Sequence, residues 1–294
     1  MGPTAIGKTA VAIQLAQHFQ TEIISADSRQ FYKELNIGTA KPGEEELKLV
    51  RHHFINSLSV HDSYNVGQFE TDSLKCLSEI FKKHDVAVMA GGSGLFVNAV
   101  CNGLDQLPET DPETRSELKK ELEQNGIDSL QKRLSKLDPE YYDVVDKSNP
   151  HRLIRAIEIC LQTGLKYSEL RKKEKKDRNF HCIKIGLDDT REKIYARINK
   201  RVDEMIANGL IEEAKQFYPD RELNALQTVG YSELFEFLEN KCSLEEAINL
   251  IKRNTRRYAK RQLTWFRKDP EIKWFAPGEA DQIIQYLDGE IANN

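Results

Sequence analysis

Residues 2–9 read Gly-Pro-Thr-Ala-Ile-Gly-Lys-Thr, which satisfies the G-x-x-x-x-G-K-[ST] pattern of a phosphate-binding loop. In that pattern, glycines let backbone N–H groups converge on phosphate oxygens, and the lysine reaches the terminal phosphates. The helix-favouring run at 10–16 predicts that the loop lies at a helix N-terminus, where the dipole attracts anions. An accidental glycine turn is the alternative, and the complete set of fixed positions disfavours it. The predicted phosphate-binding residues are Gly2, Pro3, Thr4, Ala5, Ile6, Gly7, Lys8 and Thr9, with the Thr9 hydroxyl as a Mg²⁺ ligand.

A loop of this kind normally follows a buried strand, and here only Met1 precedes it. Either the sheet dispenses with that strand, or a segment upstream supplies it. We expect the second arrangement, because a loop with no strand behind it would be mobile.

Composition narrows the class of protein. A chain of 294 residues, 39% of them hydrophobic, can bury one large core or two. The net charge of −4 does not decide on nucleic acid, because a binding face is a local property. Five scattered cysteines without a C-x-x-C pair disfavour a zinc site or a disulfide framework. Without a signal peptide or an apolar run of about 18 residues, we expect a soluble, cytoplasmic protein that contacts no membrane.

Two apolar runs, at 21–26 and 86–90, each end in a polar or glycine-rich turn, and 182–187 and 272–275 read as further strands. Strand–loop–helix units of this type predict a parallel α/β sheet with ligands at the C-terminal ends of its strands. Charged segments of helical period begin at about 111 and include 112–124, 127–136 and 150–163. We therefore expect a P-loop-type parallel sheet flanked by helices, formed by 1–110 and 181–294, with an all-helical domain at 111–180.

Helices are also expected near 190–208, 230–240 and 243–268, with a last helix after the strand at 272–275. The charged stretch at 171–178 is interpreted as a solvated loop or helix end.

Asp27 is the first candidate for chemistry beyond the loop, because it follows the strand at 21–26. A carboxylate there could ligate Mg²⁺, act as a general base or contact a ribose, and the structural alternative is an N-cap. The second strand ends in Gly91-Gly92-Ser93 instead of the acid of an ATPase metal site, which disfavours an ATP-hydrolysing motor. The turn at 91–94 is either an anion-binding turn or a tight connection.

The segment 252–268 indicates nucleic-acid binding, because it carries eight basic residues and no acid. Arg253, Arg257, Lys260 and Arg261 fall on one helical face, and aromatic residues are interleaved with them. A solvated helix balanced by acids elsewhere is the alternative.

Weaker candidates are the pairs Arg152 with Arg155 and Arg197 with Arg201, each spaced to hold phosphate. His52 and His53 would point to opposite faces of a strand, so hydrogen-bonding or core roles are favoured over a shared metal ion.

Taken together, these motifs resemble the tRNA dimethylallyltransferase (tRNA isopentenyltransferase) family, in its bacterial form. Its pattern follows the phosphate loop with Ser-x-Asp-Ser-x-Gln at 25–30 and Ile-Gly-Thr-Ala-Lys-Pro at 37–42. It continues with His-His-Phe-Ile at 52–55, a Gly-Gly loop at 91–93, Asp-Pro-Glu-Thr-Arg at 111–115 and Asn-Pro-His-Arg at 149–152. Val-Gly-Tyr at 229–231 and Lys-Arg-Gln-Leu-Thr-Trp-Phe-Arg at 260–267 complete it. The C₂H₂ zinc extension of the eukaryotic enzymes does not follow.

The resemblance implies transfer of a dimethylallyl group from dimethylallyl diphosphate to the exocyclic amine of the adenosine 3′ of the anticodon, in tRNAs that read U-initial codons. Lys8, Thr9, Mg²⁺ and Arg201 would stabilise the leaving diphosphate. Asp27 would accept the proton of the amine, and Ser93, where the family usually has threonine, would orient donor or base.

The resemblance also implies a tRNA anticodon stem-loop as partner, and we expect a monomer. The residues it assigns to tRNA binding are Asp27, Ser28, Arg29, Gln30, Ser93, Arg115, His151, Arg152, Leu153, Ile154, Arg155, Gly230, Tyr231, Arg256, Arg257, Lys260 and Arg261. Three rival interpretations remain: an adenylate isopentenyltransferase that acts on free AMP, ADP or ATP, a small-molecule kinase that binds ATP at the loop, and a non-catalytic RNA-binding module.

Overall fold

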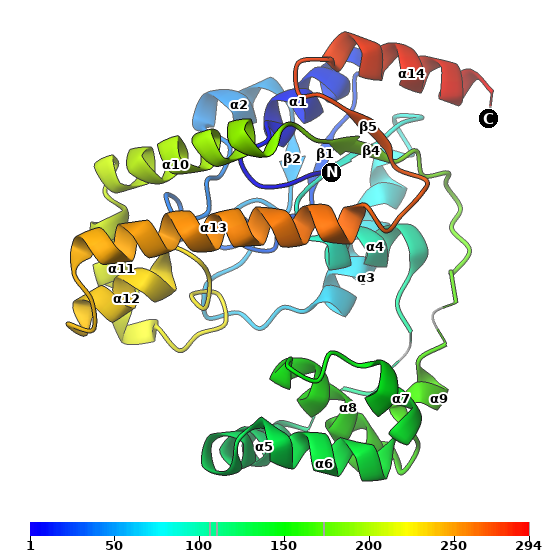
Figure 1. The fold of residues 1–294 in the computed structure, drawn as a ribbon. Coiled ribbons are helices and arrows are strands. Elements are labelled where there is room, and N and C mark those ends of the chain that lie inside the picture. The colour runs from blue at the N-terminus through cyan, green and yellow to red at the C-terminus, as the bar shows by residue number, and fades with distance from the viewer. Residues whose placement is uncertain (106, 110, 173, 294) are drawn as a thin grey trace. The chain divides into compact units, whose positions relative to one another are not determined.

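The computed structural model describes residues 1–105, 107–109, 111–172 and 174–293. The chain divides into two units: Met1–Cys101 with Arg178–Asn294, and Asn102–Asp177. The first unit holds all the strands found in the described chain, and the second is helical (Figure 1). This mixed α/β fold with an inserted helical segment is the predicted class.

Two small parallel sheets form the centre of the first unit. Strands β1 (Ile23–Ser25), β2 (His52–His53) and β3 (Val88–Ala90) pair in the order β2-β1-β3, and β4 (Ile185–Leu187) pairs with β5 (Lys273–Phe275). Every pairing is parallel, with Ile24 of β1 opposite Met89 of β3. Because β1 is buried along its whole length, its sequence is an apolar run and does not alternate.

The backbone of Met1 continues the pairing at the edge of β4. Its amine donates to the carbonyl of Ile185 at 2.7 Å, and its carbonyl accepts from the N–H of Leu187 at 2.8 Å. The phosphate loop thus starts from a backbone that β4 anchors.

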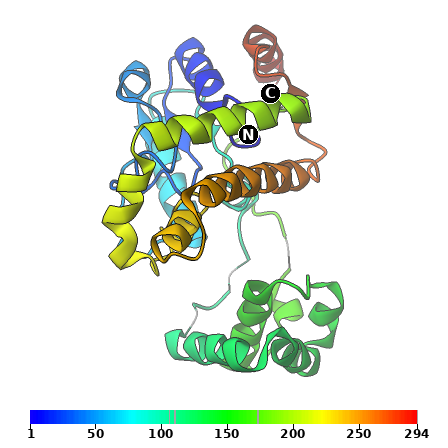
Figure 2. The same ribbon diagram turned by 60° about the vertical axis from the view of Figure 1, so that its left-hand side comes forward.

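Helices cover these sheets. In the first unit they are α1 (Lys8–His18), α2 (Glu44–Leu49), α3 (Val66–Ile80), α4 (Gly94–Asn102), α10 (Arg191–Ala207), α11 (Leu210–Phe217), α12 (Tyr231–Leu238), α13 (Leu244–Phe266) and α14 (Ala280–Ala292), with a 3₁₀ turn at Tyr218–Asp220. Helix α1 packs against β3 and beside α14, and α13 runs along α10 (Figures 1 and 2). Sequence reasoning missed α2, α3 and α11, although the reciprocal Asn65 and Gln68 cap of α3 is a readable start signal.

The second unit contains α5 (Pro112–Asn125), α6 (Ile127–Leu137), α7 (Pro139–Val144), α8 (Pro150–Thr163) and α9 (Tyr167–Leu170). Three of these helices begin with an acid or amide followed by proline, because the side chain caps the first N–H groups and proline needs none. Its core is its own and includes Leu118, Leu130, Leu134, Leu153 and Ile157.

The charged stretch at 171–178 was expected to be solvated, and this expectation is wrong for Arg178. Its side chain is 11% exposed, and its Nη2 donates to Glu70 Oε1 at 2.6 Å and to the carbonyl of Ala99 at 2.8 Å. The guanidinium satisfies carbonyls at the C-terminal end of α4, which accounts for its burial. Residues 174–177 are exposed as predicted, while position 173 lies outside the described residues.

Among the described residues, no helix combines the length and the apolar composition needed to cross a membrane.

Candidate active site

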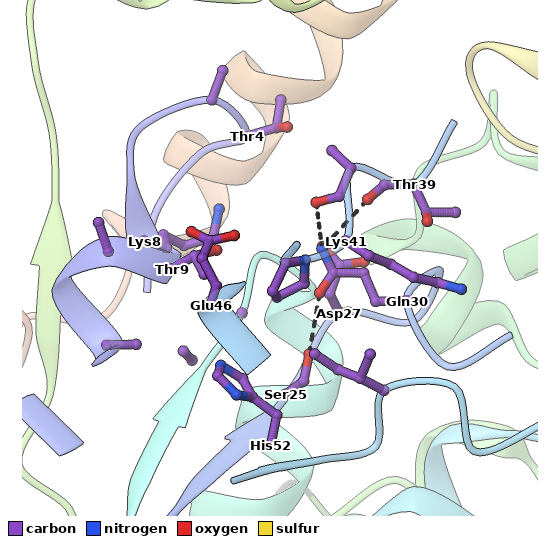
Figure 3. Close-up of a pocket in the computed structure, with 18 of the residues that line it drawn as sticks. Thr4, Lys8, Thr9, Ser25, Asp27, Gln30, Thr39, Lys41, Glu46 and His52 are labelled. Atoms are coloured by element: carbon purple, nitrogen blue, oxygen red, sulfur yellow. Dashed lines mark hydrogen bonds between the residues drawn. The ribbon is translucent and has the colours of Figure 1, made fainter. Parts of the chain in front are cut away.

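A cavity of about 460 Å³ lies where the phosphate loop meets the C-terminal end of β1. Figure 3 shows Lys8, Thr9 and Glu46 on one side of the view and Asp27, Gln30, Thr39 and Lys41 on the other. Ligands of parallel α/β sheets bind at this edge, so the cavity is the candidate active site. Residues that line it include Thr4, Ala5, Gly7, Lys8, Thr9, Ser25, Asp27, Gln30, Asn36, Ile37, Thr39, Ala40, Lys41, Glu46, His52, Gly91, Arg201 and Glu204.

The phosphate loop has the features of an anion site. Gly7 adopts φ 99° immediately before α1, a conformation that favours glycine, and no side chain caps the helix there. The first N–H groups of α1 therefore have no side-chain acceptor at the helix start, and the residues there, Lys8 and Thr9, line the cavity. The Lys8 ammonium donates to the carbonyl of Pro3 at 2.8 Å, and burial lowers its pKa to about 8 despite the nearby Asp27.

Asp27 and Ser93 are held together by backbone. A Cβ on Gly91 would lie 2.2 Å from the carbonyl oxygen of Ala26, so only glycine permits this approach of the turn to the end of β1. The N–H of Ser28 then donates to Ser93 Oγ at 3.1 Å, while Asp27 Oδ1 accepts from the N–H of Arg29 at 3.1 Å. The structure thus brings the predicted acid and the predicted hydroxyl to one place.

Tyr258 of α13, one of the aromatic residues interleaved with the predicted basic face, joins this group. Its hydroxyl is hydrogen-bonded to Ser93, and burial raises its pKa to about 12, with Asp27 acting in the same direction.

Of the predicted pair on α10, only Arg201 lines the cavity. Burial lowers the pKa of Arg201, and the charges of Glu204 and Asp27 oppose that shift, which places the guanidinium among the acids of the site. Arg197 instead forms an ion pair with Asp189, at 2.9 Å between Nη2 and Oδ2.

Glu213 is a site residue that the sequence did not indicate. Its carboxylate accepts from the backbone N–H groups of Asn36, Ile37 and Gly38, at 3.0, 3.0 and 2.9 Å, and from the hydroxyl of Tyr231. These bonds fix the loop 36–42 along the cavity. No sequence motif marks Glu213, which is one of two adjacent acids on α11, whereas Lys41 belongs to the Ile-Gly-Thr-Ala-Lys-Pro motif.

Several residues that the resemblance assigned to tRNA have partners inside the protein. Arg29 Nη1 donates to the carbonyl of Asn224 at 2.7 Å, and Gln30 Nε2 donates to the carbonyl of Ala40 at 3.1 Å. Gly230 and Tyr231 are buried. Both side chains at 29–30 therefore hold neighbouring loops, and the Tyr231 ring serves the loop 36–42.

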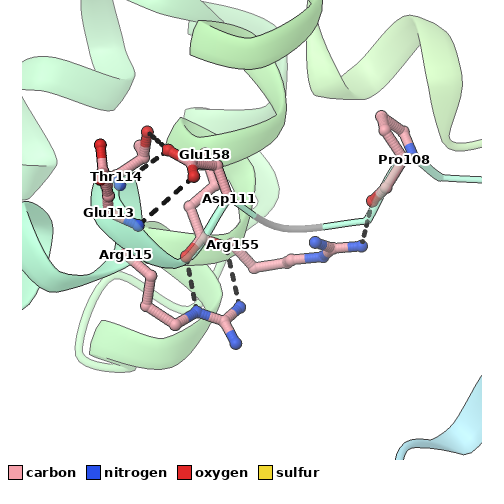
Figure 4. A network of polar contacts seen from close by, with 7 residues as sticks. All are labelled: Pro108, Asp111, Glu113, Thr114, Arg115, Arg155 and Glu158. Carbon is pink, nitrogen blue, oxygen red and sulfur yellow. Dashed lines mark hydrogen bonds and ion pairs between the residues drawn. The ribbon is translucent and has the colours of Figure 1, made fainter.

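In the helical unit, residues that the resemblance assigned to tRNA also have partners inside the protein (Figure 4). The Arg115 guanidinium makes two hydrogen bonds to the buried carboxylate of Glu158, at 2.6 and 2.8 Å, and Arg155 donates to the carbonyl of Pro108 at 3.1 Å. Leu153 and Ile154 belong to the helical core, so their side chains offer no surface to RNA. His151 and Arg152 are exposed at the start of α8.

Helix α13 has a basic outer face and a packed inner face. Arg253, Arg257, Lys260 and Arg261 are exposed, as their predicted common face requires. Arg256 points elsewhere, because its Nη1 donates to Asn199 Oδ1 of α10 at 2.7 Å.

The donors around Thr9 fit a hard cation. Hydroxyl and carboxylate oxygens of Thr9, Asp27, Glu46 and Glu204 line the cavity, and Mg²⁺ prefers such ligands together with phosphate oxygens. In the described chain, no three His, Cys, Asp or Glu side chains gather to hold a metal without such help. His52 Nδ1 bonds to the carbonyl of Val50, while His53 Nε2 bonds to Glu22, so the two rings serve different partners.

Residues 30–269 match the model of the family described as IPP transferase. The tRNA dimethylallyltransferase of Christiangramia forsetii is 59% identical over 99% of this chain and 97% of its own length, and that of Cytophaga hutchinsonii is 49% identical over 99% and 96%.

Solved structures of tRNA-modifying prenyltransferases are also similar to this chain. The full-length tRNA isopentenylpyrophosphate transferase of Bacillus halodurans superposes with a TM-score of 0.72 at 37% identity, over 99% of this chain and 94% of that one. A eukaryotic dimethylallyltransferase acting on tRNA gives a TM-score of 0.81 at 26% identity, over 100% and 78%. This chain belongs to the IPP transferase family.

Proposed function

We propose that this protein transfers a dimethylallyl group from dimethylallyl diphosphate to the exocyclic amine of the adenosine 3′ of the anticodon, in tRNAs that read U-initial codons. The observation that carries the proposal is one cavity that holds both a phosphate loop and the Asp27 carboxylate, with no acid at the end of β3. The names of the relatives, tRNA dimethylallyltransferases, support the same reaction.

In the reaction, the bond between the allylic carbon and the diphosphate oxygen breaks, and a bond forms from that carbon to the adenine nitrogen. Negative charge builds on the leaving diphosphate, and Lys8, Arg201 and the first N–H groups of α1 face that charge. Asp27 takes the proton that the amine nitrogen loses, which leaves a neutral secondary amine. Mg²⁺, held by the Thr9 hydroxyl, would add charge stabilisation to the diphosphate. ATP has no part in this chemistry.

The adenine must leave its stack to reach the cavity. Ser93 and Tyr258 lie beside Asp27 and are placed to orient the flipped base. The exposed cations of α13 and the start of α8 would hold the RNA backbone of the anticodon stem-loop. We propose that one monomer supplies all these groups.

The test is an incubation of the protein and Mg²⁺ with labelled dimethylallyl diphosphate and, in parallel, with tRNA, AMP or ATP. We expect label in tRNA alone, and in a tRNA whose target adenosine is replaced by guanosine we expect none. Asp27→Asn keeps the shape and removes the base, so its rate should fall by about 10²–10⁴-fold while tRNA affinity is retained. Label in AMP or ATP would instead identify an adenylate isopentenyltransferase, and no label anywhere would refute transfer.

A further inference from the structure

Gln262 lies on the inner face of α13, one turn beyond Tyr258, and is 6% exposed. Its Oε1 accepts from the backbone N–H of Thr4 at 2.8 Å, and its Nε2 donates to the carbonyl of Gly92 at 2.9 Å. One amide therefore joins the phosphate loop to the turn that carries Ser93. Among the hydrogen bonds and ion pairs of the described residues, those of Gln262 alone join these two segments through a side chain.

The amide group suits this bridge because it pairs one acceptor with two donors. A carboxylate offers only acceptors and a lysine only donors, so neither could satisfy both the N–H of Thr4 and the carbonyl of Gly92. The fit is also tight. A Cβ on Gly92 would lie 2.3 Å from Gln262 Nε2 and 3.5 Å from Lys8 Nζ, so the bridge stands directly beside the catalytic lysine.

We propose that Gln262 is a positioning residue, which fixes the distance between the phosphate loop and the turn that orients the acceptor base. This inference rests on the proposed function. The diphosphate is held by the loop of Thr4 and Lys8, and the adenine by the group around Ser93 and Asp27. The reacting carbon and nitrogen belong to different substrates, so their separation depends on how these two segments are held relative to each other. A misplacement of about 1 Å can cost about 10²-fold in rate.

A buried amide could also serve stability alone, since an unsatisfied N–H and carbonyl would destabilise the fold. The two roles differ in what they change. A purely structural bridge would lower the melting temperature and leave the rate of the folded protein unaltered. A positioning bridge would lower kcat even when the protein is fully folded and saturated with both substrates.

The test uses Gln262→Met, which keeps length and volume but makes neither hydrogen bond. We expect kcat with tRNA to fall by about 10–100-fold and affinity for inorganic diphosphate to fall by about tenfold, with tRNA affinity within about twofold of wild type. Gln262→Asn keeps the amide but is one methylene too short to reach both partners, so it should lose about tenfold in kcat with a melting temperature closer to wild type. The control is Gln282→Met, the same change at an exposed position of α14, which should behave as wild type.

Calorimetry with inorganic diphosphate, filter binding of tRNA, thermal melting and single-turnover rates supply the readouts. Values of kcat and diphosphate affinity within twofold of wild type in both Gln262 variants would overturn the inference. So would a loss confined to melting temperature. A wild-type protein that binds inorganic diphosphate but transfers no dimethylallyl group would refute the proposed function instead, and the affinity of the Gln262 variants for diphosphate would still report on the bridge.

Discussion

Lys8 shows how the surroundings of one residue set its charge. Burial lowers the pKa of its ammonium group to about 8, while Asp27 raises it and Arg201 lowers it further. Without a bound anion, Lys8 therefore has a pKa of about 8, well below the usual value for a lysine. A bound diphosphate would favour the charged form and raise the pKa again.

The charge of Lys8 makes the affinity for inorganic diphosphate depend on pH. Below pH 8 the free protein already carries the charged Lys8, and above pH 8 it must take up a proton when diphosphate binds. Affinity for inorganic diphosphate should therefore fall by up to about tenfold per pH unit above pH 8 in the wild type. In Lys8→Met the affinity for diphosphate should be weaker, and the part of its fall above pH 8 that is due to Lys8 should be absent. Calorimetry from pH 7 to pH 9.5 measures both. Parallel curves for the two proteins would show that Lys8 does not titrate against the ligand, since the ionisation of diphosphate itself is common to both.

Individual residues also show what the sequence could and could not predict. Lys8, Thr9 and Asp27 line the cavity, and the sequence could indicate them because each stands in a short motif or at the end of a strand. The roles of Glu213 and Gln262 could not be predicted from the sequence, because the partners of each residue lie far away along the chain. Thr4 and Gln262 are 258 positions apart, and only the packing of α13 brings them together. Arg115 was assigned to RNA for the same reason, as its partner Glu158 lies 43 positions away.

At the scale of elements, the two faces of α13 differ, since one is buried and the other is exposed and basic. Ala259, Gln262 and Phe266 are buried, while Arg257, Lys260 and Arg261 are exposed. The sequence pattern predicted the helix and its basic face, but a helix dense in cations gives no sign that its inner face carries an amide for the phosphate loop. We therefore propose that this one helix combines RNA contact with alignment of the site.

The outer face can be tested by charge removal. In the variant R257Q/K260Q/R261Q, each lost phosphate contact should reduce the slope of log K against log salt for tRNA by about 0.7–0.9, or about 2–3 altogether. The matched control K75Q/K82Q/K83Q removes the same charge from exposed positions on α3 and just after it, and should leave the slope unchanged. Filter binding between 50 and 300 mM salt gives both slopes. Equal slopes in the two variants would remove α13 from the RNA interface.

At the scale of the whole molecule, the helical unit is an insertion with its own core. Every residue of that core lies between Leu107 and Leu170, and none comes from the larger unit. The ends of the insertion meet, because the N–H of Lys176 donates to the carbonyl of Asn102 at 2.8 Å. The Arg178–Glu70 ion pair lies entirely within the larger unit.

These features predict that the two units can be separated without loss of the active site. Replacement of Asn102–Asp177 by a short Gly-Ser linker should leave a cooperative thermal transition and diphosphate affinity within about threefold of wild type, since the cavity and its cations lie in the retained unit. Affinity for tRNA should fall by about 10²-fold, because this variant lacks one of the two RNA-binding surfaces that we propose. Thermal melting, calorimetry with inorganic diphosphate and filter binding give the three quantities. Retained tRNA affinity would place RNA recognition entirely on the larger unit, and loss of diphosphate binding would show that the insertion is needed to shape the site.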